Sequence, residues 1–223
     1  MGVLHIVPTP IGNLTDITLR AIETLKRVDV VLAEDTRTSK TLLQKYDIST
    51  PLWSFHAHNE HKKVDEILRK LKEGTTFAQI SDAGMPGVSD PGHLLIREAI
   101  KNEINLEVLP GPSAFLVALL KSGFPTDRFI YEGFLPHKKG RKSRIEAWKE
   151  ESKTVVIYES PHRLLKLLEQ CKEILGDSRE ISVSRELTKK FEETITGSLS
   201  NVLHLFRQKS IKGEFVIVIN GNK

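Results

Sequence analysis

The stretch Val3-Leu4-His5-Ile6-Val7-Pro8-Thr9-Pro10-Ile11-Gly12-Asn13 begins the pattern that decides the fold. Its apolar first part, residues 3–7, is typical of a buried strand, and residues 8–12 predict a turn because they combine Pro and Gly. Apolar residues then recur at helical spacing, namely Leu14, Ile17, Ala21, Ile22, Leu25 and Val28. We expect Asn13 or Thr15 to cap that helix. A strand, a turn and a helix in succession indicate the α/β class.

The same alternation continues along the whole chain. Strands are expected at 30–33, 52–56, 76–80, 106–109, 129–132, 155–158, 181–184 and 215–219, with an antiparallel strand at 192–196. Helices are expected at 39–46, 64–71, 93–100, 113–121, 141–149, 163–175 and 199–206. This pattern predicts α/β domains with largely parallel and mixed sheets. Because Gly and Pro cluster at 122–127, we expect two domains, residues 1–122 and 123–223.

The composition excludes several classes of protein. The chain has 33 Lys and Arg, 29 Asp and Glu, and a net charge of +4, so it is no polycation. A single cysteine, Cys171, excludes an internal disulfide and a zinc site of several cysteines. The N-terminus lacks the basic region of a secretory signal, and no uninterrupted apolar stretch is long enough to cross a bilayer. We therefore expect a cytoplasmic protein that is not in a membrane.

Loops that combine Gly and Pro follow four of the predicted strands. In open parallel sheets, ligands bind beyond the carboxyl ends of the strands. The four loops cover residues 8–13, 81–92, 109–114 and 158–163. Glycine lets a backbone approach a ligand closely and proline restricts the loop beforehand, which suits a small polar molecule. The sequence has neither G-x-G-x-x-G nor G-x-x-x-x-G-K-[ST], so a usual NAD or ATP site is disfavoured.

Acidic and basic residues lie together at two of the predicted strand ends. The segment Glu34-Asp35-Thr36-Arg37 follows a strand. A carboxylate there could act as general base and Arg37 could hold a phosphate. A local ion pair, with Asp35 or Thr36 capping a helix, is the alternative. The same alternatives apply to Glu159 with Arg163 and to Arg185 with Glu186.

Two further clusters invite a functional interpretation. His56, His58 and His61 lie close in sequence, but their spacing matches no standard zinc site, so we expect exposed polar residues or RNA contacts and no metal. The second cluster is a run of five cations, Lys138, Lys139, Arg141, Lys142 and Arg144. Such a run can neutralise the phosphates of a nucleic acid, and a solvated basic helix start is the alternative.

With these segments, the chain closely resembles the small-subunit ribosomal RNA methyltransferases that modify the 2′-oxygen of a cytidine, within the tetrapyrrole methylase superfamily. The resemblance rests on residues 7–14, 33–37, 81–92, 110–114, 158–163 and 213–216, which span nearly the whole chain. It implies two α/β domains with S-adenosyl-L-methionine in the cleft between them. It also implies 16S rRNA in the small ribosomal subunit as substrate, and a homodimer.

The resemblance further implies which residues contact the cofactor. They are Pro10, Gly84, Met85, Val88, Ser113, Ala114, Ser160, Gly213, Glu214 and Phe215. Gly84-Met85-Pro86 corresponds to a Gly-Asp-Pro motif of tetrapyrrole methylases, with Met85 in the place of the Asp. The segment 213–215 is expected near the adenine.

A ribose hydroxyl is only weakly acidic, so a nearby carboxylate would assist methyl transfer by accepting its proton. Asp35 is the first choice for this base, followed by Glu34 and Glu159, and Arg37 is expected to anchor a neighbouring phosphate. The cations at 138–144 are expected to bind RNA backbone. Two other functions stay open: a tetrapyrrole C-methyltransferase, and a ribosome assembly factor without catalytic activity.

Overall fold

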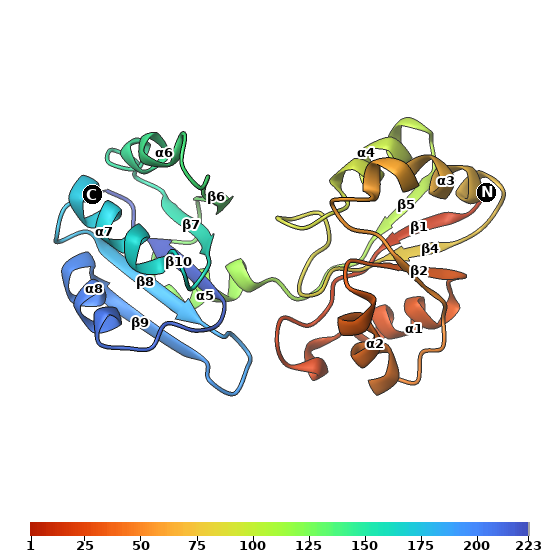
Figure 1. Cartoon of the computed structure of the whole chain (residues 1–223), viewed down its shortest axis with the longest axis horizontal. Helices are drawn as coiled ribbons and strands as arrows, with labels where there is room; N and C mark the ends of the chain where they lie inside the picture. The colour runs from red at the N-terminus through yellow and green to blue at the C-terminus, as the bar shows by residue number, and fades with distance from the viewer. Residues whose placement is uncertain (223) are drawn as a thin grey trace. The chain divides into compact units, whose positions relative to one another are not determined.

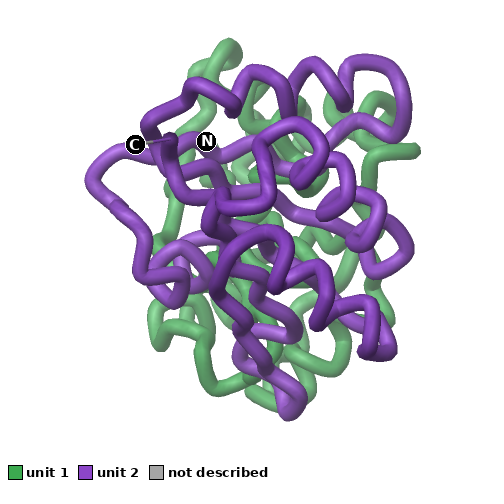
Figure 2. The backbone as a smooth tube through the Cα atoms, turned by 90° about the vertical axis from the view of Figure 1, so that its left-hand side faces the viewer, with its two compact units in different colours: residues 1–113 green, residues 114–223 purple. Residues whose placement is uncertain are grey.

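The computed structural model describes residues 1–222, and the chain divides into two compact units. Unit 1 comprises residues 1–113 and unit 2 begins at Ala114 (Figure 2). The division lies ahead of residue 122, where the Gly/Pro-rich segment led us to expect it. Helix α5 (Ala114–Ser122) belongs to unit 2 because it packs on two strands of that unit, β8 (Glu180–Arg185) and β10 (Phe215–Ile219).

Unit 1 is built on a parallel sheet with the strand order β3-β2-β4-β1-β5 (Figure 1). Its strands are β1 (Val3–Ile6), β2 (Val30–Ala33), β3 (Leu52–Ser54), β4 (Phe77–Gln79) and β5 (Asn105–Val108). Its helices are η1 (Leu14–Asp16), α1 (Leu19–Arg27), α2 (Thr36–Lys45), α3 (Glu60–Lys72) and α4 (His93–Lys101). Helices α3 and α4 pack on one face and α1 and α2 on the other. Because all strands are parallel, their carboxyl ends lie at one edge.

The first helix differs from the expectation. Apolar spacing predicted one helix from residue 14, but a short 3₁₀ turn, η1, precedes α1. The Asn13 side chain accepts a hydrogen bond from the backbone N of Thr15, and so caps η1. The N-cap of α1 is Thr18, whose Oγ1 accepts from the backbone N of Ala21 at 3.1 Å. Thr18 has extended backbone angles and a hydroxyl, as an N-cap requires, so neither predicted cap was right for α1.

Unit 2 has a mixed sheet with the order β6-β7-β10-β8-β9. Its strands are β6 (Phe129–Phe134), β7 (Thr154–Glu159), β8 (Glu180–Arg185), β9 (Glu193–Ser198) and β10 (Phe215–Ile219). Strand β6 is parallel to β7, whereas β10 is antiparallel to β7 and β8, and β9 is antiparallel to β8 as expected. Phe215 pairs with both Glu159 and Arg185, so the start of β10 lies between the ends of β7 and β8.

The remaining helices, with α5, are α6 (Arg141–Ala147), α7 (Leu164–Leu175) and α8 (Leu199–Arg207). Apolar side chains of α6, α7 and α8 and of the sheet form the core of unit 2. Helix α3, with 13 residues, and α7, with 12, are long for this chain. No helix within residues 1–222 has the length and apolar character needed to span a membrane.

Candidate active site

Loops from neighbouring strands contact one another at the carboxyl edge of the sheet in unit 1. Thr9, after β1, and Gly84, after β4, exchange two backbone hydrogen bonds of 2.9 and 3.0 Å. The Thr9 hydroxyl donates to the carbonyl of Ser81 at 2.9 Å. The loop after β2 joins them, because the backbone N of Asp35 donates to Oδ1 of Asp82 at 3.2 Å. The structure therefore brings together the loops that the sequence placed at one edge.

Two glycines make this packing possible. A Cβ at Gly111 would lie 2.6 Å from Cβ of Pro8, so the loops after β1 and β5 approach too closely for a side chain. Gly92 has a φ of +124°, and a Cβ there would lie 1.6 Å from Nε2 of Gln79. That nitrogen donates to the carbonyl of Pro91 at 2.9 Å and so holds the loop after β4. Side chains at these two positions would therefore disturb the packing of the loops.

Carboxylates gather at the ends of β2 and β4. Burial raises the pKa of Glu34 above its ordinary value, and the negative charges of Asp82 and Asp35 add to this rise against the opposing effect of His56. Burial likewise raises the pKa of Asp82, and the charge of Asp35 adds to it, whereas the hydrogen bond from Asp35 acts against it. A carboxylate with a raised pKa is a stronger proton acceptor once it is ionised.

Asp35 has a structural role instead. It is the N-cap of α2, with Oδ1 accepting from the backbone N of Arg37 at 2.8 Å. The Arg37 guanidinium also binds it, with Nη2 2.7 Å from Oδ2. These hydrogen bonds from Arg37 lower the pKa of Asp35 to about 2. A carboxylate with so low a pKa is a weak base, so the structure favours Glu34 over the first-choice Asp35.

Two of the expected site residues in unit 2, Glu159 and Arg141, are buried and paired with each other. The Glu159 side chain has no exposed surface, and its Oε2 lies 2.9 Å from Nη1 of Arg141. Its Oε1 lies 3.0 Å from Nε of Arg163 and also accepts from the backbone N of Ser160 at 2.9 Å. This burial disfavours Glu159 as a general base, and it disfavours Arg141, which is only 4% exposed, as an RNA contact. The two side chains neutralise each other in the interior and fix the position of the Ser160 loop.

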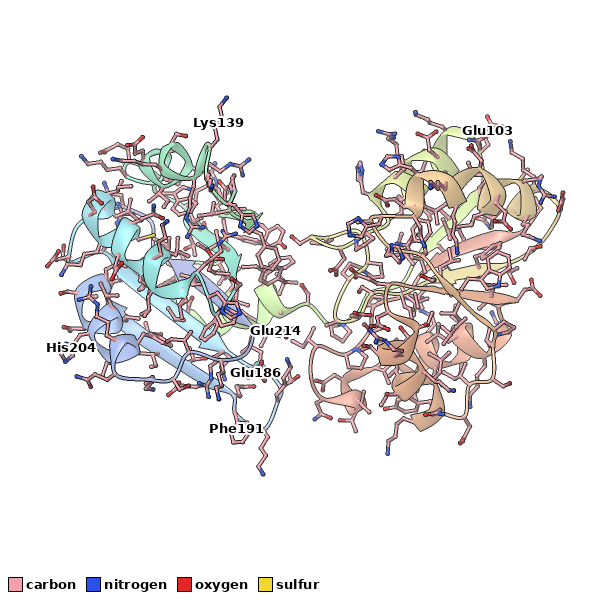
Figure 3. All side chains as sticks on the ribbon, in the orientation of Figure 1. Glu103, Lys139, Glu186, Phe191, His204 and Glu214 are labelled. Carbon is pink, nitrogen blue, oxygen red and sulfur yellow. The ribbon has the colours of Figure 1, made fainter. Side chains whose placement is uncertain are left out.

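The other cations of the basic run remain at the surface. Lys138, Lys139 and Lys142 are exposed. Figure 3 shows Lys139 projecting away from the sheet. Arg144 is half-exposed and pairs with Glu132 at 2.8 Å. The burial of Arg141 was detectable in the sequence, because it shares a helical face with the apolar Ile145 and Trp148.

A second backbone contact organises the start of β10. Glu186 and Glu214, labelled in Figure 3, exchange hydrogen bonds: N of Glu186 donates to the carbonyl of Glu214 at 3.0 Å, and N of Glu214 donates to Oε1 of Glu186 at 2.9 Å. Lys189 binds both carboxylates, at 3.2 and 2.7 Å. Phe215 is 2% exposed and packs against Phe206, so only its backbone is available to a ligand.

The expected cofactor residues are distributed over both units. Unit 1 contributes Pro10, Gly84, Met85, Val88 and Ser113, and unit 2 contributes Ala114, Ser160, Gly213, Glu214 and Phe215. Val88 and Glu214 are exposed, Pro10, Gly84 and Phe215 are buried, and the others are half-buried. Asp82 lies in the predicted ligand loop 81–92 but was not itself named as a site residue. Its place shortly after β4, at the same edge as Glu34, was the signal that could have found it.

The histidine cluster forms no metal centre in the part of the chain that the structure describes, since no group of three or more His, Cys, Asp or Glu there could hold a metal ion. The His56 and His58 rings lie 6.0 Å apart, edge to face. Nδ2 of Asn59 lies 3.2 Å from Nε2 of His56, at the start of α3. The contacts of His56 are thus those of a turn before a helix.

A parallel-sheet unit with a glycine-rich carboxyl edge, followed by a mixed-sheet unit, defines an α/β protein of two units. Solved structures share this fold. Diphthine synthase has a TM-score of 0.79 at 13% identity, with 99% of this chain and 90% of that chain covered. A cobalt precorrin-4 methyltransferase of cobalamin biosynthesis has a TM-score of 0.72 at 16% identity, with 98% and 94% covered. Residues 3–203 match the tetrapyrrole (corrin/porphyrin) methylases, and the chain belongs to that family.

Relatives with high identity share one name, ribosomal RNA small subunit methyltransferase I. The Thermotoga maritima protein is 48% identical over 223 residues, which is 100% of both chains. The Bacillus subtilis protein is 47% identical, with 100% of this chain and 76% of its own length covered. The Escherichia coli O157:H7 protein is 46% identical, with 100% and 79% covered. The resemblance, the α/β fold and the methyltransferase class with its S-adenosyl-L-methionine cofactor are thereby confirmed.

Proposed function

We propose that this chain transfers a methyl group from S-adenosyl-L-methionine to the 2′-oxygen of a cytidine in 16S rRNA of the small ribosomal subunit, in the cytoplasm. The observation that carries the proposal is the 48% identity with a ribosomal RNA small subunit methyltransferase I over the full length of both chains. The exposed cations Lys138, Lys139 and Lys142 support it, because they suit a polyanionic substrate.

The residues at the two strand edges fit the cofactor. In unit 1, Gly111 has no room for a Cβ against Pro8 in the loop after β1, and Gly92 has none against the side chain of Gln79 in β4. In unit 2, the buried Glu159 fixes the Ser160 loop, and Glu186 fixes the backbone at Glu214. We propose that the carboxyl edge of unit 1 contributes to cofactor binding. When bound, the cofactor supplies an electrophilic methyl group attached to a sulfonium.

Glu34 is the proposed proton acceptor. Its raised pKa arises from burial and from the charges of Asp82 and Asp35, and this makes it a better base than an ordinary exposed carboxylate. It would accept the proton of the ribose hydroxyl as the oxygen attacks. Asp35 holds Arg37 at the start of α2, where the 90% exposed guanidinium can anchor a neighbouring phosphate. Positioning of the two substrates supplies the remaining catalysis.

The proposal includes a homodimer, as the family resemblance implies. Leu116 and Leu120 on α5 are 44% and 72% exposed and lie one helical turn apart, which offers an apolar stripe for self-association. Light scattering on the purified protein tests this part. A mass of one chain at micromolar concentration would contradict it.

The test of the reaction compares substrates directly. The purified chain is incubated with methyl-labelled cofactor and either small ribosomal subunits or a porphyrinogen. We expect label in the RNA only. Label in the macrocycle would support a tetrapyrrole C-methyltransferase instead. If calorimetry shows no cofactor binding and neither substrate is labelled, a non-catalytic assembly factor becomes the better interpretation.

A further inference from the structure

A cavity of about 310 Å³ lies in unit 1 between α2 and the loops after β1 and β4. Its lining residues include Thr38, Ser39 and Thr41 on α2, which carry hydroxyls, and Asp82, which carries a carboxylate. Apolar residues, among them Leu42 and Ile80, form other parts of the wall. The cavity therefore combines apolar surface with a few polar groups, as small-molecule sites do.

Ser39 is the second observation that points to a ligand. Its residue is 3% exposed, and its Oγ is buried with no hydrogen-bond partner among residues 1–222. A buried hydroxyl that has lost water and gained no partner is unfavourable, and buried polar groups in native structures nearly always have a partner. A ligand atom in the cavity would supply the missing hydrogen bond.

The lining also indicates which chemistry the ligand has. No Lys or Arg occurs among the described residues that line the cavity, so a phosphate is disfavoured there. Asp82 is an acceptor, and its carboxylate retains acceptor capacity beyond the hydrogen bond from the backbone N of Asp35. The site therefore favours an uncharged, flat molecule that carries a hydrogen-bond donor for Asp82. Further polar atoms of that molecule would form hydrogen bonds with the hydroxyls on α2.

We propose that this cavity binds the pyrimidine base of the substrate cytidine, with Asp82 accepting a hydrogen bond from the exocyclic amine and Ser39 bonding to a ring acceptor. This inference rests on the proposed function and adds a base-reading site to it. Cytosine presents the N4 amine as a donor, to which a carboxylate is the matching acceptor. Uracil presents an oxygen at that position, which faces the carboxylate of Asp82 unfavourably.

The experiment measures the ratio of methylation rates on cytidine and uridine. Small subunits are reconstituted with either nucleotide at the mapped target position and incubated with labelled cofactor. For the wild type we expect a preference for cytidine of about tenfold or more. Asp82→Asn should reduce the ratio to about threefold or less, because an amide presents both a donor and an acceptor. Asp82→Asn also changes the charge near the proposed base Glu34, but this change affects the rates on both nucleotides and so cancels in their ratio.

A matched pair of variants tests the cavity itself. Thr41 and Gln44 are both exposed on α2, but only Thr41 lines the cavity. Thr41→Phe should raise KM for the RNA about tenfold or more by filling the space, whereas Gln44→Phe should leave KM and cofactor binding unchanged. A wild-type ratio near one, a ratio that Asp82→Asn does not change, or equal KM values for the two Phe variants would overturn the inference.

A binding measurement separates this inference from the proposed reaction. Free cytidine is titrated into the labelled protein and followed by NMR. We expect shifts of the backbone signals of residues 38–42 in the wild type and not in Thr41→Phe. If the wild type methylates no RNA but these shifts occur, the proposed function fails while the base site stands. If the protein methylates RNA and cytidine shifts no signal on α2, the base site is contradicted.

Discussion

Two strand ends in this molecule carry an acid followed closely by an arginine, and the structure uses them in opposite ways. In unit 1, Glu34 lies half-buried among other carboxylates, and its pKa is raised. In unit 2, Glu159 is fully buried and neutralised by Arg141 and Arg163. The comparison teaches that the charges that surround a carboxylate decide whether it can act as a base or only holds a loop in place.

The largest expected effect is on catalysis at Glu34. Glu34→Gln removes the proton acceptor and preserves the shape of the side chain, so kcat should fall about 10²- to 10⁴-fold. The equilibrium constant for cofactor binding should stay within about twofold, since Glu34 is not among the expected cofactor residues. Single-turnover methyl transfer to small subunits, together with calorimetry, measures both quantities.

The pH dependence provides the control for this variant. A general base must be deprotonated, so the wild-type rate should rise with pH through the raised pKa of Glu34, above the ordinary value of 4.5. This acidic limb should be absent from the residual activity of Glu34→Gln. A variant that keeps both its rate and its acidic limb would exclude Glu34 as the base.

Substitution of Glu159, the corresponding acid in unit 2, should lower the free energy of unfolding. Glu159→Ala leaves two guanidinium groups without their shared partner in the interior, which should cost about 3–5 kcal/mol of unfolding free energy. Glu169→Ala is the control, because Glu169 and its partner Arg207 are 49% and 57% exposed and the pair should contribute less than about 1 kcal/mol. Denaturant unfolding measures both. Equal losses would show that the Glu159 pairs are unimportant for stability.

Two neighbouring cations, the exposed Lys142 and the buried Arg141, should differ in their effects on RNA binding and on stability. Lys142→Gln should leave stability unchanged and reduce the slope of log affinity for RNA against log salt concentration by about 0.7–0.9, as expected for one phosphate contact. Arg141→Gln should lower the stability, because Arg141 is buried against Glu159, and should leave that slope unchanged. Salt titrations of RNA binding separate the two. A reduced slope in Arg141→Gln would contradict the assignment of Arg141 to the interior.

The smallest effect is expected at Asp35. Asp35→Asn retains the N-cap, because Asn caps helices as well as Asp does, so activity should stay within about threefold of the wild type. The same transfer assay applies. A fall in kcat comparable to that of Glu34→Gln would restore Asp35 as the base.

Much of the fold could be predicted from the sequence because it depends on local periodicity. Strands 30–33 and 215–219 lie as expected, and the antiparallel strand expected at 192–196 is β9, which spans 193–198. The interruption between η1 and α1 was missed because the apolar spacing continues through Ile17, although the backbone there is extended. Helix α5 was assigned to the first domain because a Gly/Pro segment marks a turn but does not show which sheet a helix packs on.

The candidate site was predictable only in part. The sequence identified the loops at the strand ends, because Gly, Pro and acidic residues are visible there. It did not reveal the neutralisation of Glu159 by Arg141, since these residues are separated by 18 positions and meet only in the folded core. The orphaned hydroxyl of Ser39 is likewise a property of packing. Contacts between distant segments decide such roles, and a periodic pattern carries no information on them.

The chemical identity of the methylated product decides whether this chain methylates a ribose of 16S rRNA. Small ribosomal subunits from cells that lack this gene are incubated with the purified chain and labelled S-adenosyl-L-methionine, and the RNA is digested to nucleosides and analysed by mass spectrometry. We expect label in 2′-O-methylcytidine at one position of 16S rRNA. Label on a base instead of the ribose, or no label in the RNA while the cofactor binds, would contradict it.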